Sequence, residues 1–235
     1  MHVLSYYPSR LLAAAVAAAF AAFATAAIPS APAVRPTNLL VHAVPAEWAP
    51  DEAPPKPWQH SDRDDGISVR RVEHEGASWI ELRDDSAEKA ANLRQEFPPL
   101  KAGRLTFRVA LPRDHVGEFG VYLGQGNASA PVERVVEFKT SSRGIVVIGS
   151  AGERVNTQLS LSSGMTDHLF LEFSPVGHDL QLRLGRLLPD GTELLLGETT
   201  VPQQAHAVTR LRITTDNLPR GARVLVTDLV LSPAS

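Results

Sequence analysis

The sequence predicts an all-β protein built from two packed antiparallel sheets. After Gly66, short runs of alternating apolar and polar residues are separated by turn-forming clusters such as "RDDG" (63–66) and "DNLPRG" (216–221). About a dozen such runs follow one another, which is more than one open sheet of ordinary size accommodates. The pattern therefore favours a β-sandwich.

Several runs also predict which side chains point into the core. In "RLTFRVAL" (104–111) the apolar residues occupy every second position, as expected for a strand with one buried face. "HLFLEF" (168–173), "DLQLRL" (179–184) and "TRLRIT" (209–214) repeat this pattern. The side chains expected to point inward are Leu105, Phe107, Val109, Leu111, Leu169, Leu171, Phe173, Leu180, Leu182, Leu184, Leu211 and Ile213.

The segment 84–97 is ambiguous. Asp85 and Glu88 could form a capping box at the start of a helix. However, "FPPL" follows immediately, and residues 92–97 alternate in polarity. We therefore expect a loop followed by a strand over residues 91–97.

The first 26 residues have the pattern of an export signal. Arg10 precedes an uncharged run that begins at Leu11, and "ATAA" (24–27) supplies the small residues that a signal peptidase requires. Cleavage is expected after Ala26. The alternative is an uncleaved membrane anchor, for which this alanine-rich stretch is short and weakly apolar.

The expected organisation follows from these boundaries. Residues 1–26 form a signal peptide, residues 27–66 a Pro- and Ala-rich lead-in with one strand near 38–44, and residues 67–235 the sandwich domain. The mature protein is expected to be secreted or periplasmic. It has no cysteine, which excludes disulfides, thiolate catalysis and zinc–thiolate sites. The formal charge of −3 of the whole chain argues against nucleic acid and anionic membranes as partners.

The order of several phrases carries a family resemblance. "GASWIELRDDS" (76–86), "LRQEFPPLKAGRLTFRVALP" (93–112), "FGVYLG" (119–124), "HLFLEFSPVGHDLQLRL" (168–184) and "VLVTDLVLSP" (224–233) follow one another along the chain. This order resembles that of the concanavalin A-like lectin and glucanase superfamily over roughly residues 67–233. The resemblance implies a jelly-roll sandwich.

Catalytic members of that superfamily carry a Glu-x-Asp-x-(x)-Glu strand, and the nearest segment here is "ERVVEF" with Glu133 and Glu137. These two residues share a face, but at about 3.4 Å per residue they lie about 13–14 Å apart. Glycoside hydrolysis requires carboxyl groups about 5–9.5 Å apart. The middle aspartate is also missing, so no catalytic residue is assigned.

Metal and ligand signals are weak. "SDRDDG" (61–66) is rich in oxygen ligands but lacks the EF-hand pattern, so structural calcium is the one cofactor considered. The histidines are not at metal-ligand spacing, and no metal ligand is assigned. Trp48, Trp58 and Trp79 could stack on sugar rings, but packing within the sandwich is favoured. "NAS" (127–129) is a glycosylation acceptor that matters only in a eukaryotic secretory host.

Six outward arginines could form a basic stripe if their strands are neighbours. The favoured interpretation is that their stems cover apolar surface and their guanidinium groups pair with acidic residues. The alternative is a patch for an anionic glycan. These residues are Arg104, Arg108, Arg183, Arg210, Arg212 and Arg223.

Asp228 lies within the apolar run "RVLVTDLVLSP" (223–233). Strict alternation places it on one face with Val224, Val226 and Val230, which predicts a largely buried carboxylate. A buried carboxylate needs partners. We therefore expect Asp228 to be structural and to accept hydrogen bonds from backbone amides, a hydroxyl or an arginine.

The sequence thus predicts a secreted, non-catalytic β-sandwich module that binds carbohydrate or assists polysaccharide processing. Its expected partner is a polysaccharide or glycan, and its ligand-binding residues are not identified. Two alternatives stay open: a hydrolase or lyase that acts on glycans through a site not visible in the sequence, and a structural protein of the cell surface.

Overall fold

The computed structural model describes residues 39–61, 66–86, 90–111, 118–125, 134–140, 145–150, 154–161, 166–202, 207–216, 218 and 220–234. The predicted signal peptide and its cleavage site lie outside these residues. Pro36–Ser235 form one compact unit. Its only described helical element is the 3-10 turn η1 (Pro45–Glu47), and no described segment forms a helix able to cross a bilayer.

One sheet has eight strands, seven of which follow the order β13-β12-β11-β6-β15-β4-β3, with β1 paired to β15. All of its strand pairs are antiparallel. Its strands are β1 (Val41–Ala43), β3 (Ile67–His74), β4 (Ala77–Asp84), β6 (Gly103–Ala110), β11 (Thr166–Val176), β12 (Asp179–Leu187), β13 (Glu193–Pro202) and β15 (Arg223–Pro233).

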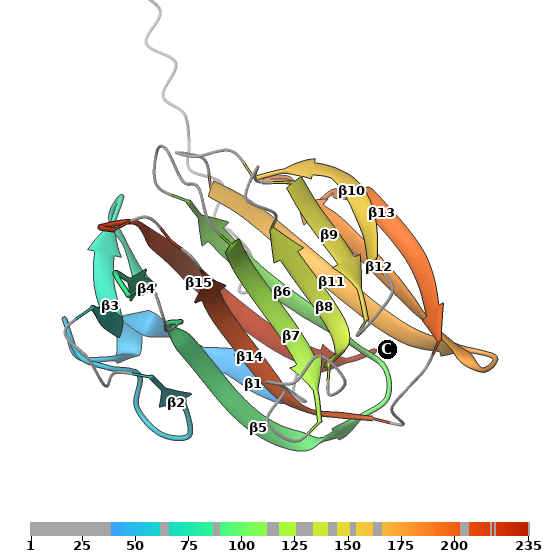
Figure 1. Cartoon of the computed structure of the whole chain (residues 1–235), viewed down its shortest axis with the longest axis horizontal. Coiled ribbons are helices and arrows are strands. Elements are labelled where there is room, and N and C mark those ends of the chain that lie inside the picture. The colour runs from blue at the N-terminus through green and yellow to red at the C-terminus, as the bar shows by residue number, and fades with distance from the viewer. Residues whose placement is uncertain are drawn as a thin grey trace, which may run out of the picture. The chain divides into compact units, whose positions relative to one another are not determined.

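The other sheet has seven strands in the order β10-β9-β8-β7-β14-β5-β2, and it is also antiparallel throughout. Its strands are β2 (Gln59–His60), β5 (Asn92–Leu100), β7 (Glu118–Gly124), β8 (Arg134–Thr140), β9 (Ile145–Gly149), β10 (Arg154–Ser160) and β14 (Val208–Asp216). Figure 1 shows this sheet in front of the eight-stranded sheet. The predicted two-sheet sandwich is confirmed.

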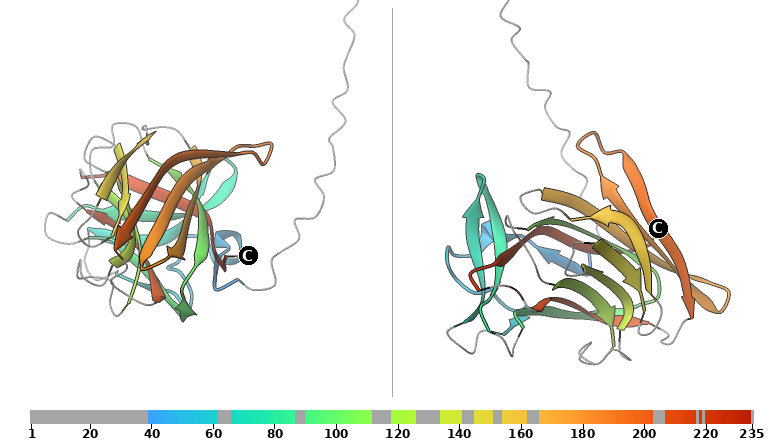
Figure 2. Two further views of the ribbon diagram at one scale, coloured as in Figure 1. Left: turned by 90° about the vertical axis from the view of Figure 1, so that its right-hand side faces the viewer. Right: turned by 45° about the horizontal axis from the view of Figure 1, so that its top comes forward.

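The two sheets approach each other at one edge. There β10 of the seven-stranded sheet lies beside β13 of the eight-stranded sheet, as the views in Figures 1 and 2 show. A Cβ atom on Gly197 would come within 2.8 Å of the Thr157 side chain, so only glycine allows this approach without a shift.

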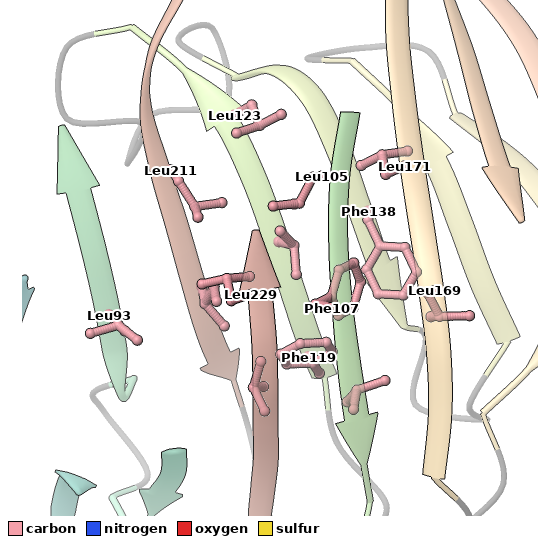
Figure 3. Packing of buried hydrophobic residues seen from close by; sticks show 14 of the residues in the cluster. Leu93, Leu105, Phe107, Phe119, Leu123, Phe138, Leu169, Leu171, Leu211 and Leu229 are labelled. Atoms are coloured by element: carbon pink, nitrogen blue, oxygen red, sulfur yellow. The ribbon is translucent and has the colours of Figure 1, made fainter. Parts of the chain in front are cut away.

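The hydrophobic core fills the space between the sheets (Figure 3). All twelve side chains expected to point inward are buried, none with more than 3% of its surface exposed. At the centre, Phe107 of β6 meets Phe138 of β8 edge-to-face with ring centroids 5.4 Å apart, and Phe119 of β7 completes the group. Side chains from both sheets therefore interlock.

The described part of the N-terminal lead-in, residues 39–61, belongs to the compact unit. The strand expected near residues 38–44 is observed as β1, which pairs with β15 so that Val41 lies opposite Leu231. Trp48 and Trp58 retain only 9% and 6% of their surface exposed. These two indole rings add apolar area to the core, which ties this Pro-rich segment to the sandwich.

The ambiguous segment contains the predicted strand. β5 spans Asn92–Leu100, so it begins close to the expected position and continues through both prolines. Residues 87–89, including Glu88 of the alternative capping box, lie outside the described residues.

The prediction that Asp228 is buried is wrong. A β-bulge between Thr227 and Val230 interrupts the pairing of β15 with β6, and Asp228 occupies its left-handed position with φ of 50°. The extra residue reverses the alternation, so Leu229 points into the core and the Asp228 side chain stays 56% exposed. Its carboxylate lies 3.4 Å from Nη1 of Arg108, one of the partner types expected.

Replacing Phe138 with alanine should destabilise the sandwich strongly. Phe138 is fully buried and contacts phenylalanines of both sheets, so Phe138→Ala leaves a cavity and should lower the free energy of unfolding by about 3–5 kcal/mol. Urea unfolding measures this change. Val155→Ala, at a site 40% exposed, serves as the control with a change below about 0.5 kcal/mol. Equal losses in both variants would contradict this account of the core.

The bulge makes a separate prediction for Asp228. Glycine and asparagine accept a left-handed backbone, and an exposed ion pair contributes little. Asp228→Gly and Asp228→Asn should therefore change the free energy of unfolding by less than about 1 kcal/mol. Asp228→Val should lose about 1–3 kcal/mol, because a β-branched residue is strained at positive φ. Thermal unfolding ranks the three variants. An Asp228→Val variant as stable as the wild type would argue against the bulge.

Candidate functional site

Of the two glutamates in "ERVVEF", the structure describes only Glu137. Glu133 lies outside the described residues. Glu137 is fully buried in β8, although it faces outward from the core on the seven-stranded sheet. Nη2 of Arg154 lies 3.0 Å from its Oε1, and Nη1 of Arg134 lies 3.6 Å from the same atom. The two guanidinium groups offset the cost of burying its charge.

The six predicted arginines divide between the two sheets. Arg104, Arg108, Arg183 and Arg223 lie on the eight-stranded sheet, and Arg210 and Arg212 on the seven-stranded sheet. Carboxylate partners are described for Arg104, Arg108, Arg183, Arg210 and Arg223, as the favoured interpretation predicted. The partners are Glu172 and Glu193 for Arg104, Asp228 for Arg108, Glu172 and Glu198 for Arg183, Glu81 for Arg223, and Glu96 for Arg210.

The tryptophans serve packing, as expected. Trp79 is 1% exposed on the outer face of the eight-stranded sheet, and the Arg108 guanidinium lies 5.3 Å from its ring centroid. With Trp48 and Trp58 also buried, none of the three offers an open stacking surface. Within the described residues, no three potential metal ligands cluster, and residues 62–65 of the calcium candidate lie outside them.

A continuous polar row crosses the outer face of the seven-stranded sheet. The strand register places one residue from each strand beside the next, so seven strands contribute to one line perpendicular to their direction. This line, here called the central row, consists of Gln59, Arg94, Arg212, Tyr122, Glu137, Gly149 and Arg154.

Gly149 permits the ion pair at one end of the central row. Arg154 on β10 and Glu137 on β8 are separated by β9, where Gly149 is paired with both. Because glycine has no side chain, Arg154 can extend across β9 to the carboxylate. Its Nε and Nη2 atoms lie 3.2 and 3.1 Å from Oε2 of Glu137.

Tyr122 lies flat at the centre of the row. A Cβ atom on Gly120 would come within 2.4 Å of the Tyr122 hydroxyl, so the ring lies over this glycine. The Arg134 guanidinium stacks above the ring, 4.2 Å from its centroid. Burial, together with the nearby negative charge of Glu137, raises the pKa of Tyr122 to about 12. The phenol therefore stays protonated, and its O–H is a hydrogen-bond donor.

The other end of the row carries two arginines directly opposite each other. Arg94 of β5 is paired with Arg212 of β14. Each donates from Nε to a neutral amide oxygen: Arg94 to Gln59 at 2.9 Å, and Arg212 to Asn92 at 2.7 Å. Beside them, Arg210 of β14 lies opposite Gly124 of β7 in the strand register, and Gly124 lies opposite Arg134 of β8. The face thus offers many fixed N–H donors.

No two described glutamates on this face have carboxyl groups at the separation that glycoside hydrolysis uses. Glu118 lies four residues from Tyr122 along β7, which places it about 13–14 Å along the strand from the level of Glu137. Glu96 is on β5, three strands from β8, or about 14 Å across the sheet. Both separations exceed the range of about 5–9.5 Å that glycoside hydrolysis uses.

Sequence reasoning identified Arg210 and Arg212 but missed Arg94, Tyr122, Arg134 and Arg154. Arg94 and Tyr122 lie in segments recognised as strands, and their alternation places them outward. Nothing in the sequence, however, shows that β5, β14, β7 and β8 are neighbours in that order. Only the pairing of strands distant in sequence assembles the central row.

Comparisons with known proteins bear on the fold. No protein-family model matches the chain, and no curated protein matches its sequence. Among solved structures, a sialidase is similar with a TM-score of 0.58 and 14% identity; the match covers 76% of this chain and 17% of the sialidase. The Ca²⁺/Man3GlcNAc-bound exoplasmic/lumenal domain of VIP36 has a TM-score of 0.52 and 9% identity, over 76% of this chain and 84% of that domain.

The Ca²⁺-bound form of the same VIP36 domain gives a TM-score of 0.50 at 8% identity. The chain spans less than a fifth of the sialidase, and all identities are low, so the likeness concerns the fold. The two-sheet topology and these neighbours together confirm the implied jelly roll. The chain has a concanavalin A-like jelly-roll fold.

The environment of Tyr122 predicts its titration. In a spectrophotometric titration of the full chain, the difference between wild type and Tyr122→Phe should report a phenol with a pKa of about 12, because burial and Glu137 disfavour the phenolate. Since this pKa is raised from the ordinary value of 10.0, the contribution of Tyr122 to stability is present below pH 10 and is lost as the pH rises towards 12. A difference titration centred near 10 would contradict the buried arrangement.

Proposed function

We propose that this chain is a non-catalytic module that binds carbohydrate through the outer face of its seven-stranded sheet. The observation that carries this proposal is the central row, in which guanidinium, amide and phenol groups from several strands are held in place by one another. Sugars present many hydroxyl groups, and fixed planar donors and acceptors suit them because little side-chain entropy is lost on binding.

The fold likeness supports the same proposal. One of the similar structures, the VIP36 exoplasmic/lumenal domain, was solved with Man3GlcNAc bound. That ligand belongs to VIP36, and at 9% identity its contacts do not transfer to this chain. The likeness supports a glycan as the kind of ligand for this chain, whose seven-stranded sheet carries fixed polar groups on its outer face.

The non-catalytic part of the proposal rests on the separation of the glutamates. Glu137 is buried between Arg134 and Arg154, which hold its carboxylate as an ion-pair partner rather than leaving it free to approach a glycosidic bond. Glu96 and Glu118 lie too far from it to act as a catalytic pair. The export-type pattern of residues 1–26 adds that the module acts as a secreted or periplasmic protein.

Glycan-array binding of the full chain tests the proposal. At least one class of oligosaccharide should bind, and Arg212→Gln should weaken that binding about tenfold or more, because hydrogen bonds from a charged donor are lost. Arg183→Gln is the matched control, since it removes an arginine from the outer face of the eight-stranded sheet. Circular dichroism checks that both variants fold.

Two results would contradict the proposal. An array with no bound glycan would remove carbohydrate binding, and loss of binding in Arg183→Gln with retention in Arg212→Gln would move the site to the other sheet. A reducing-sugar release assay on the bound glycans tests the second half of the proposal. Sugar release would show that the module is an enzyme.

A further inference from the structure

A cavity lies beside the bulge of β15 in the eight-stranded sheet. On one side of β15, the strand register with β4 stops at Val226, and the register with β1 begins at Leu229. Thr227 and Asp228 therefore lie opposite the break between β4 and β1, and both line the cavity. Its volume of about 370 Å³ is at the small end of the range of about 300–1,000 Å³ that ligand pockets occupy.

The bulge brings the Asp228 carboxylate to this cavity. Bulges recur next to active sites, where they re-aim a side chain. Asp228 has φ of 50°, a backbone conformation that glycine adopts at less cost. The fold itself therefore does not require a carboxylate at this position, whereas a ligand site would use one.

Arg108 and Asp228 form a loose ion pair at the cavity. Nη1 of Arg108 lies 3.4 Å from Oδ2 of Asp228, whereas a hydrogen bond between two such charged groups measures about 2.7–2.9 Å. On the same face, Arg104 and Arg183 each lie 2.8 Å from an oxygen of Glu172. Since the contact between Arg108 and Asp228 is longer, the guanidinium group can still donate to a ligand and the carboxylate can still accept from it.

Internal contacts hold the groups around the cavity in position. The Arg108 guanidinium lies over the Trp79 ring, 5.3 Å from its centroid. Thr227 donates from Oγ1 to the backbone carbonyl of Ser78 at 3.0 Å, which ties β15 to the start of β4. Ser78 in turn donates from Oγ to Glu73 at 2.8 Å. A ligand therefore meets groups that are already ordered, so little side-chain entropy is lost on binding.

The residues that line the cavity favour a neutral ligand. Its ionisable side chains are a guanidinium, two carboxylates and an imidazole, from Arg108, Glu73, Asp228 and His42. The two carboxylates disfavour an anion, and the guanidinium beside them disfavours a cation. Small residues complete the lining and leave room for an apolar C–H surface: Ala43, Ala46, Gly76 and Ala77.

We infer that this cavity binds a vicinal diol of a neutral sugar and that Asp228 and Arg108 hold the diol between them. One hydroxyl donates to the Asp228 carboxylate, and the neighbouring hydroxyl accepts from the Arg108 guanidinium. The small apolar residues contact the C–H groups of the ring. The cavity belongs to the eight-stranded sheet and the central row to the other sheet, so this inference goes beyond the proposed function and does not depend on it.

Saturation-transfer NMR of the full chain with single sugars tests the inference. The neutral probes are the methyl α-glycosides of glucose, mannose and galactose, and the charged probes are glucuronate and glucosamine. At least one neutral glycoside should bind, and it should bind more tightly than either charged sugar. The inference fails if no neutral glycoside binds, or if a charged sugar binds as tightly as the best neutral one.

Variants then locate the sugar. Asp228→Gly accepts the left-handed backbone and removes the carboxylate, so the affinity for the tightest neutral glycoside should fall about tenfold or more. Ala46→Phe fills the cavity from an exposed position and should also abolish binding, although it alters neither charged group. Asp179→Asn is the matched control, because it removes an exposed carboxylate from β12 of the same sheet, and it should leave the affinity unchanged.

Circular dichroism checks that each variant folds. Unchanged affinity in folded Asp228→Gly would overturn the inference, as would an equal loss in Asp179→Asn. The glycan array separates this site from the proposed one. Array binding that is lost in Asp228→Gly and kept in Arg212→Gln would support the cavity and contradict the proposed site on the seven-stranded sheet.

Discussion

The apolar layer between the two sheets is the contact on which every other feature depends. The chain has no cysteine, so no disulfide holds the sheets together, and the strands join in an order far from their order in sequence. Phe107 on one sheet and Phe119 and Phe138 on the other interlock at the centre of this layer (Figure 3). Because the inner faces are filled in this way, the outer faces keep a fixed register. The central row exists only as long as that register holds.

The strands and the buried faces could be predicted because alternation is a local property. Leu105, Phe107 and Val109 show their common face within one segment, and the structure buries all three. The failure at Asp228 has an equally local cause. A bulge adds one residue to β15, and after it the alternation continues on the opposite face, so Leu229 enters the core in place of its neighbour. No feature of "VTDLV" distinguishes a bulged strand from a regular one.

The candidate site could not be predicted in the same way, because its residues come from strands that the sequence does not place side by side. Along the chain, the nearest acidic residue to Glu137 is Glu133, whereas the partners of Glu137 in the structure are Arg134 and Arg154. The arginine stripe shows the same difficulty. Pairing with acidic residues could be expected from composition, but the division of the arginines between two sheets depends on topology.

Glycines give the seven-stranded face its character. Gly124 and Gly149 end strands, and Gly120 lies within β7. Each lies beside a long polar side chain that needs room: Tyr122 over Gly120, Arg154 across Gly149, and Arg134 and Arg210 on either side of Gly124. Without Cβ atoms beneath them, these groups can lie along the sheet and bind one another. The polar groups of the row are therefore preorganised by internal partners.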